Sequence, residues 1–329
     1  MSNLLKSVFI LLFGFFLHAG ELFAEQFSQD DLSWLKKMVF AAHRSNYSGT
    51  FIYQSGNYVE TSRLTHLVEG ANEHERLESL DGERSEVIRR NGRVWCYQGD
   101  GKVMVARRDG ARIFPALLPE QFLLLQENYR IRRGEEDRVA GYAAHSMIFI
   151  PRDKMRYSHR MWAHNDSGLL LKAVVQDERD HVIEQYTFTQ LNLGGDIDRK
   201  WIDRHVPDAE VASDKVDAAG ASHALMNESG WMVYALPSGF KKITEVTRHW
   251  HGKKFPVTHL AFSDGMAGIS VFIEKQEENS GARKGLHSNG LIQVYTKILG
   301  DYLLTVIGEV PPRTVMQVAE SVRNGKQKQ

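Results

Sequence analysis

Turn signals recur at short intervals up to about residue 193, and they constrain the fold more than any other feature of the chain. Asp81-Gly82 and Asn91-Gly92 are dipeptides that favour the positive-φ turns of β-hairpins. The runs between such turns are short and strand-like: Thr50–Tyr53, Tyr58–Val68, His74–Leu80, Ser85–Arg90, Arg93–Tyr97, Tyr142–Ile150 and three strands within 157–193. We therefore predict one meandering antiparallel sheet with only a few helices to cover it.

Two segments interrupt the strand pattern. Ser28 can cap a helix, and it is followed by a stripe of apolar residues at helical spacing: Leu32, Leu35, Val39 and Ala42. This helix should end between His43 and Asn46. Further along, Pro119 suits a first helical turn, and the run Phe122–Leu125 after it is apolar on every side.

A second, smaller unit follows a segment of decaying pattern that begins at Gly194. We expect the large unit to span residues 25–200, a linker residues 201–229, a small α+β unit residues 230–323 and a polar tail residues 324–329. Within the small unit we predict a strand from Trp231, hairpins about Asp264-Gly265 and Gly300-Asp301, and a helix opened by Pro311-Pro312 with the stripe Val315, Val318, Ala319 and Val322.

The N-terminus has the pattern of a secretory signal peptide. Lys6 supplies a positive charge, and Val8–Leu17 is an apolar run far shorter than the roughly 20 residues that span a bilayer. Ala24 marks a plausible cleavage point, although Leu22 fits the cleavage pattern poorly. We predict that residues 1–24 are removed; a retained signal anchor is the alternative. No cysteine follows the run, which argues against a lipid anchor at the mature N-terminus.

The composition indicates in which cellular compartment the protein works and excludes one class of main binding partner. The chain has one cysteine, Cys96, so it cannot form an internal disulfide. An exported chain without disulfides suits a bacterial periplasm better than an animal extracellular space. The 41 basic and 41 acidic residues balance, which argues against nucleic acid as the main partner.

The motifs of catalysis and metal binding are weak. "HERLE" at His74 lacks the second histidine of a zinc-protease helix and lies in a strand pattern, and His249 and His251 are only two ligands. Asp196 and Asp198 do not continue into a calcium loop. Cys96 has no basic sequence neighbour to activate it. We therefore expect no catalytic residue, metal or cofactor, and we read the chain as a binding protein.

The strand "LLLKAVV" is unusual because it is apolar on both faces. Leu169, Leu171, Ala173 and Val175 alternate with Leu170 and Val174, whereas a sheet with one solvated face would alternate with polar residues. Helices on one side and a loop or neighbouring domain on the other would explain this. A curved sheet whose concave face holds acyl chains is the alternative, with Phe122–Leu125 as a lid in either case.

The sequence resembles the RseB/MucB family along nearly the whole mature chain. The resemblance is carried by "NYSGTFIYQSGNYVET", "ERLESLDGERSEVIR", "RMWAHNDSGLLLKAVVQDERDHVIEQYTFTQLNLG", "VTHLAFSDGMAGISVFIE" and "GDYLLTVIGEVPPRTVMQVAESV". It implies an α+β fold with a large, half-open antiparallel barrel closed by helices, similar to the lipoprotein carriers LolA, LolB and LppX, and a smaller sheet-and-helix domain.

The resemblance also implies a function. Family members are periplasmic regulators of the sigma-E envelope-stress response that bind an RseA/MucA-type anti-sigma factor, shield it from proteolysis and release it on sensing lipopolysaccharide or mislocalised lipoprotein. A lipid carrier of LolA type and a periplasmic hydrolase are the alternatives, and a homodimer is left open. We take as lipid-cavity candidates Phe122, Leu125, Trp162, Leu171, Tyr186 and Phe188, and as partner-interface candidates Trp231 and Phe240.

Overall fold

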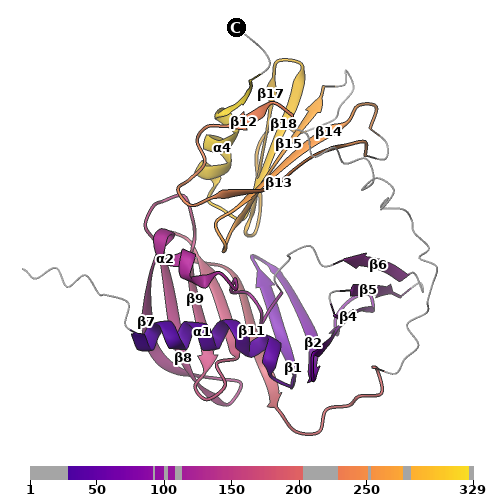
Figure 1. The fold of residues 1–329 in the computed structure, drawn as a ribbon, viewed down its shortest axis with the longest axis vertical. Coiled ribbons are helices and arrows are strands. Elements are labelled where there is room, and N and C mark those ends of the chain that lie inside the picture. The colour runs from indigo at the N-terminus through magenta and orange to yellow at the C-terminus, as the bar shows by residue number, and fades with distance from the viewer. Residues whose placement is uncertain are drawn as a thin grey trace, which may run out of the picture.

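The structure, a computed structural model, describes residues 29–91, 93–99, 103–107, 113–202, 229–250, 253–276 and 283–325. A large domain (residues 29–202) lies below a small domain (residues 229–325) in Figure 1. Each has its own antiparallel sheet and its own hydrophobic core, which confirms the predicted α+β class. The predicted signal peptide and most of the predicted linker fall outside the described residues.

The large sheet is built from two meanders that meet side by side. Its strands are β1 (Tyr47–Ser55), β2 (Tyr58–Glu69), β3 (Asn72–Ser79), β4 (Ser85–Arg90), β5 (Arg93–Gln98), β6 (Val103–Arg107), β7 (Tyr129–Val139), β8 (Tyr142–Pro151), β9 (Ser158–His164), β10 (Leu170–Gln176) and β11 (Val182–Leu193). Their order in space is β6-β5-β4-β3-β2-β1-β11-β10-β9-β8-β7. The first and last strands of the domain therefore pair at the centre, and β6 and β7 are the edges.

Helix α1 (Gln29–Arg44) crosses one face of this sheet, as Figure 1 shows. Its buried residues are Leu35, Met38, Val39, Ala41 and Ala42, which include three of the four positions of the predicted stripe. Acidic residues in its first turn and basic residues in its last turn suit the helix dipole. We call the face that it covers the concave face.

Aromatic rings fill much of the concave face beside α1. Phe114 lies 5.2 Å from Phe51, 5.3 Å from Tyr186 and 5.0 Å from Phe188, measured between ring centroids. Such offset and tilted pairs add to the free energy gained by burial. The centre of the large domain is therefore a packed core.

Strand β10 is buried on both faces, as predicted. Ala173 and Val174 are 4% and 5% exposed although they point to opposite sides of the sheet. On the convex face, the cover comes from long side chains of the sheet itself: Arg160, the register partner of Val174, and Lys172 lie 4.8 Å and 4.6 Å from the Trp162 ring. The aliphatic stems of such cations shield apolar surface while their charges stay in water.

The small domain is a six-stranded sheet with one helix and a two-stranded ribbon. The sheet contains β13 (Lys241–Arg248), β14 (Val257–Ser263), β15 (Gly268–Lys275), β16 (Gly285–Asn289), β17 (Ile292–Leu299) and β18 (Tyr302–Gly308), in the order β13-β14-β15-β18-β17-β16. Helix α4 (Pro312–Glu320) packs on β17 and β18. Strand β12 (Trp231–Val233) pairs with β19 (Val322–Asn324). The two predicted hairpins are present.

Two expectations about the C-terminal end of the small domain are wrong. Val322 is buried, but it lies in β19 beyond the helix and pairs with Val233, because the helix ends at Glu320. Asn324 pairs with Trp231 where a polar tail was expected. A stripe at helical spacing cannot distinguish the last turn of a helix from a short buried strand that follows it.

A small ionic cluster joins the end of α1 to β2 and β3. His43 Nδ1 and His66 Nε2 lie 2.9 Å and 3.0 Å from the same carboxylate oxygen of Glu73. Burial opposes ionisation of Glu73, but these hydrogen bonds outweigh it and hold its pKa well below the ordinary range.

This cluster predicts an acid-dependent loss of stability. A carboxyl whose pKa is lower in the folded state than in the unfolded state stabilises the fold above its unfolded pKa, and the contribution disappears as pH falls through the folded pKa. Glu73→Gln should therefore be less stable than wild type at pH 7, and the difference should narrow towards pH 3. Urea-denaturation midpoints across this range measure the effect, and a pH-independent difference would contradict it.

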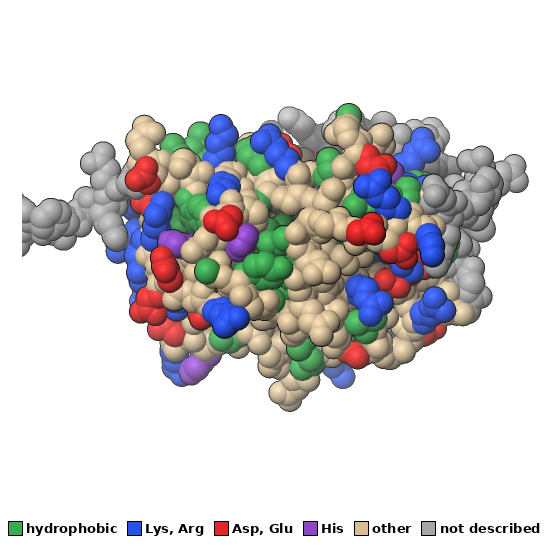
Figure 2. Space-filling model, turned by 90° about the horizontal axis from the view of Figure 1, so that it is seen from below, with side chains coloured by type: hydrophobic (Ala, Val, Ile, Leu, Met, Phe, Trp, Pro, Cys, Tyr) green, Lys and Arg blue, Asp and Glu red, His purple; other side chains and the backbone are tan. Residues whose placement is uncertain are grey.

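Acidic and basic side chains are interspersed over the face of the molecule in Figure 2, without a large field of one sign. Within the described residues, no helix is both long and apolar enough to cross a membrane.

Candidate functional site

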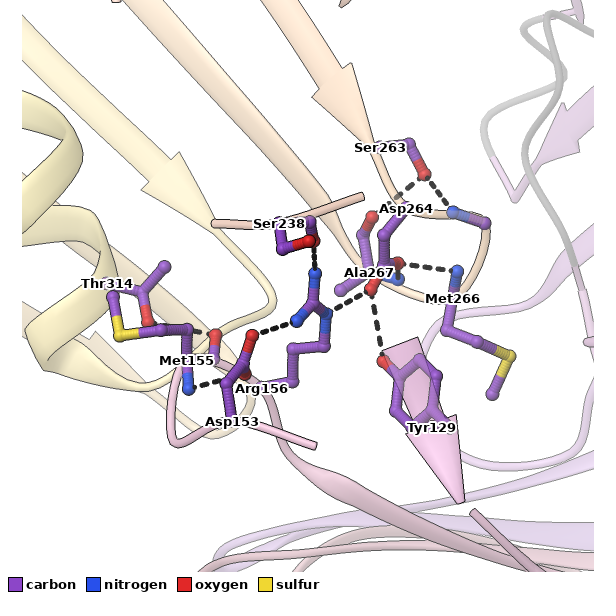
Figure 3. Close-up of polar contacts among 11 residues, drawn as sticks. Tyr129, Asp153, Met155, Arg156, Ser238, Ser263, Asp264, Met266, Ala267 and Thr314 are labelled. Atoms are coloured by element: carbon purple, nitrogen blue, oxygen red, sulfur yellow. Dashed lines mark hydrogen bonds and ion pairs between the residues drawn. The ribbon is translucent and has the colours of Figure 1, made fainter. Parts of the chain in front are cut away.

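The two domains meet through loops at the upper end of the large sheet. The large domain contributes the β8–β9 connection around Arg156 and the short helix α2 (Leu125–Asn128), which follows the 3₁₀ turn Phe122–Leu124. The small domain contributes Ser238, which precedes β13, and the β14–β15 turn with Asp264. Figure 3 shows Arg156, Ser238 and Asp264 converging on one polar cluster.

A buried ion pair lies at the centre of this cluster. Arg156 Nε is 2.6 Å from Asp264 Oδ2, and the two side chains are 1% and 0% exposed. The guanidinium also donates to the Asp153 carboxylate and to the Ser238 carbonyl. Because every charge here has a partner, the cost of burying it is offset. We call this ion pair the interdomain latch.

Both carboxylate oxygens of Asp264 accept further hydrogen bonds. The backbone N–H groups of Met266 and Ala267 donate to Oδ1, each at 2.8 Å, so the turn itself positions the carboxylate. The Tyr129 hydroxyl donates to Oδ2 at 3.2 Å. Burial and the neighbouring Asp264 charge raise the pKa of Tyr129 above its usual value, so this hydroxyl stays a neutral donor.

Close packing surrounds the latch. Arg156 lies over the Phe240 ring at 5.1 Å. A Cβ atom on Gly239, where φ is +78°, would come within 2.1 Å of the buried Asn128 side chain, so only glycine fits here. Thr314 donates to the Met155 carbonyl at 2.9 Å. The junction is therefore built like a domain core, which favours one relative position of the two domains.

A cavity opens on each side of the β14–β15 turn. The first, which we call the lateral pocket, measures about 650 Å³ and lies between residues 116–128 and β13. Its apolar lining includes Leu118, Pro119, Leu124 and Ile243, and the last two are 41% and 66% exposed. Exposed apolar side chains beside a pocket make this surface a candidate for binding.

The second cavity, which we call the inner pocket, measures about 300 Å³. The concave face of β9, β10 and β11 forms its floor, and small-domain residues 263, 266–268, 291 and 309 close it from above. Both pockets depend on the junction, because each has walls from both domains.

The structure places most of the predicted lipid-cavity residues in a packed core. Phe122, Leu125, Leu171 and Phe188 are buried in one cluster with α1. Trp162 points to the convex face, opposite Met161. Tyr186 is half-buried and lines the inner pocket. These six side chains therefore do not line one open cavity, and a lipid role for them stays a prediction.

The predicted partner-interface residues lie in the small-domain core. Trp231 and Phe240 are 8% and 7% exposed. Phe240 also contacts Arg156, so it contributes to the junction. Contact of either ring with a partner stays a prediction.

Sequence reasoning missed the latch entirely. The sequence indicates Asp264 only as a turn residue, which it also is, and Arg156 lies in a charged loop without a motif. The pair is 108 residues apart, and no periodicity links such positions. In the described part of the chain, no group of three His, Cys, Asp or Glu side chains is placed to hold a metal ion.

Comparison with known proteins decides the family. The sequence model of the MucB/RseB N-terminal domain matches residues 30–206, and that of the MucB/RseB C-terminal domain matches residues 226–323. The chain belongs to the MucB/RseB family. The predicted resemblance is confirmed.

Named MucB/RseB relatives are similar over almost their full length. The chain is 32% identical to the sigma factor AlgU regulatory protein MucB of Pseudomonas aeruginosa, covering 89% of this chain and 91% of the relative. It is 23% identical to the sigma-E factor regulatory protein RseB of Escherichia coli, covering 88% and 90%. These relatives are regulatory proteins by name.

Solved MucB structures share the fold. A complex of Pseudomonas aeruginosa MucA and MucB matches with a TM-score of 0.70 at 30% identity, covering 91% of this chain and 100% of that chain. A crystal structure of MucB matches with a TM-score of 0.61 at 29% identity, covering 90% and 98%. The MucB/RseB arrangement of two domains therefore extends to this chain.

Proposed function

We propose that this chain is a periplasmic negative regulator of an envelope-stress sigma factor. It binds the periplasmic segment of an RseA/MucA-type anti-sigma factor and shields that segment from regulated proteolysis. The observation that carries this proposal is the likeness, across both domains, to MucB in a structure that also holds MucA.

The junction supports this proposal physically. A segment that docks across both domains needs them held in one relative position, and the buried latch and the Gly239 contact provide this. A preorganised surface binds more tightly, because less conformational freedom is lost on association. The latch residues therefore position the two domains for the partner.

Release by a lipid is the second part of the proposal. The lateral pocket offers apolar side chains, Leu118, Leu124 and Ile243, on both sides of the junction. An acyl chain bound there would separate or reorient the domains only to the extent that it prefers the altered arrangement. Because the concave core is filled by aromatic rings, we place the acyl chain in this pocket.

A protection experiment tests the regulatory function. The partner's periplasmic segment is incubated with its site-1 protease, with the mature protein or with serum albumin at equal concentration. Cleavage should slow only with the mature protein. Equal cleavage rates in the two tubes would refute the proposal. Lipopolysaccharide added to the protected reaction should restore cleavage.

Light scattering on the mature protein alone shows whether the regulator is a monomer or a homodimer.

A further inference from the structure

The inner pocket has apolar walls and is small. Met161, Ala173 and Val175 form part of its floor, and Met266 of the small domain closes it from above. Its volume of about 300 Å³ is at the lower end for ligand sites and suits a single side chain or short aliphatic group.

With histidine counted as neutral, the charged side chains that line this pocket are all acidic. Glu184 and Glu309 line it, one from each domain, and none of its described lining residues is Lys or Arg. Tyr53 donates a hydrogen bond to Glu184 at 2.9 Å. The other titratable groups that line it are His159 and Tyr186.

The Glu184 carboxylate sits in an unfavourable place for a negative charge. Burial raises its pKa, the hydrogen bond from Tyr53 opposes this, and the charge of Glu309 adds to the rise. A cation entering the pocket would relieve this cost, whereas a phosphate or carboxylate would increase it.

We infer that the inner pocket binds a basic side chain, an ammonium or guanidinium group on an aliphatic stem, presented by the anti-sigma segment. The stem packs on the apolar walls and the cation pairs with Glu184, which is how Lys and Arg occupy amphipathic pockets. This inference rests on the proposed function for its occupant. Because both domains form the walls, the occupant also stabilises the docked arrangement.

The chemistry of the pocket is tested with small probes on the intact mature protein. By calorimetry, n-hexylamine should bind, while hexanoate of equal length should not. Glu184→Gln keeps an oxygen acceptor for Tyr53 but removes the charge, and it should weaken hexylamine binding at least about tenfold. Glu135→Gln, an exposed change on β7, is the matched control and should bind as wild type does.

Hexylamine binding by the wild-type protein is also measured across a pH series. This measurement needs no variant, so it does not depend on whether a variant folds. Hexylamine stays protonated in acid, so its binding should weaken as Glu184 becomes protonated, which begins above the pH at which an ordinary glutamate titrates. Hexanoate binding as tightly as hexylamine, or unchanged hexylamine binding by Glu184→Gln, would overturn the inference.

The occupant is tested with the partner's periplasmic segment. Glu184→Gln should bind it at least about tenfold more weakly than Glu135→Gln, and hexylamine should compete with it. If the variant binds the segment as wild type does, the assignment to the partner is wrong. If wild type does not bind the segment at all, the proposed function fails with it, while the probe experiment still reports the pocket's chemistry separately.

Discussion

Replacing Arg156 by Met will separate the two domains. The change leaves Asp264, which is 0% exposed, as a buried carboxylate without its cation. Removing one partner of a buried ion pair typically costs about 3–5 kcal/mol. Because 1.4 kcal/mol is a factor of ten, the ratio of docked to separated domains should fall more than about a hundredfold. Small-angle scattering should show a larger radius of gyration, and the segment should lose protection from proteolysis.

A second variant distinguishes lost charge pairing from general damage. Arg156→Met combined with Asp264→Asn removes both buried charges, while the amide oxygen that the second change introduces still accepts from the Met266 and Ala267 N–H groups. The double variant should therefore recover most of the docking that the single variant loses, and the mutant cycle gives the coupling between the two sites. Wild-type scattering from Arg156→Met alone would show that the latch does not hold the domains together.

Replacing Phe188 by Ala will destabilise the large domain by about 3–5 kcal/mol, the usual effect of truncating a buried phenylalanine. Its ring is 1% exposed and lies 5.0 Å from Phe114 and 5.9 Å from Phe51. Truncation removes these contacts and leaves a cavity that the neighbouring rings can fill only in part. Urea denaturation of the mature protein measures the loss.

The control for this prediction is Leu123→Ala. Leu123 is 55% exposed beside the buried Phe122, so its truncation should change stability by no more than about 0.5 kcal/mol. If Phe188 lined an open lipid cavity, Phe188→Ala would lower the free energy of unfolding almost as little as this control. A small effect would therefore support the predicted cavity role of Phe188.

Three of the strands that the sequence did not predict share one property. β7, β13 and β16 carry many charged or exposed residues, as in Tyr129–Val139, and all three are edge strands. Natural edge strands use charge to prevent unwanted pairing, which removes the alternation that identifies a strand. The central strand β10, in contrast, was predicted from its apolar residues alone.

The candidate site was harder to predict than the fold. Phe188 and Leu171 were recognised as apolar positions, but a ring that fills a core and one that lines a cavity have the same sequence signal. No sequence motif singles out Glu184. Its role depends on the tertiary structure, because Glu309 of the other domain lines the same pocket.

The local structure of this protein follows from its sequence alone: the hairpins at Asp-Gly turns, the amphipathic α1, the doubly buried β10 and the presence of two units. These features depend on residues a few positions apart, because the spacing of apolar residues indicates which face of a helix or strand is buried. Only the tertiary structure decided that β1 pairs with β11, that Arg156 meets Asp264, and that two pockets flank the turn between them. Such contacts join distant residues, and their energies depend on burial and geometry that no local pattern contains.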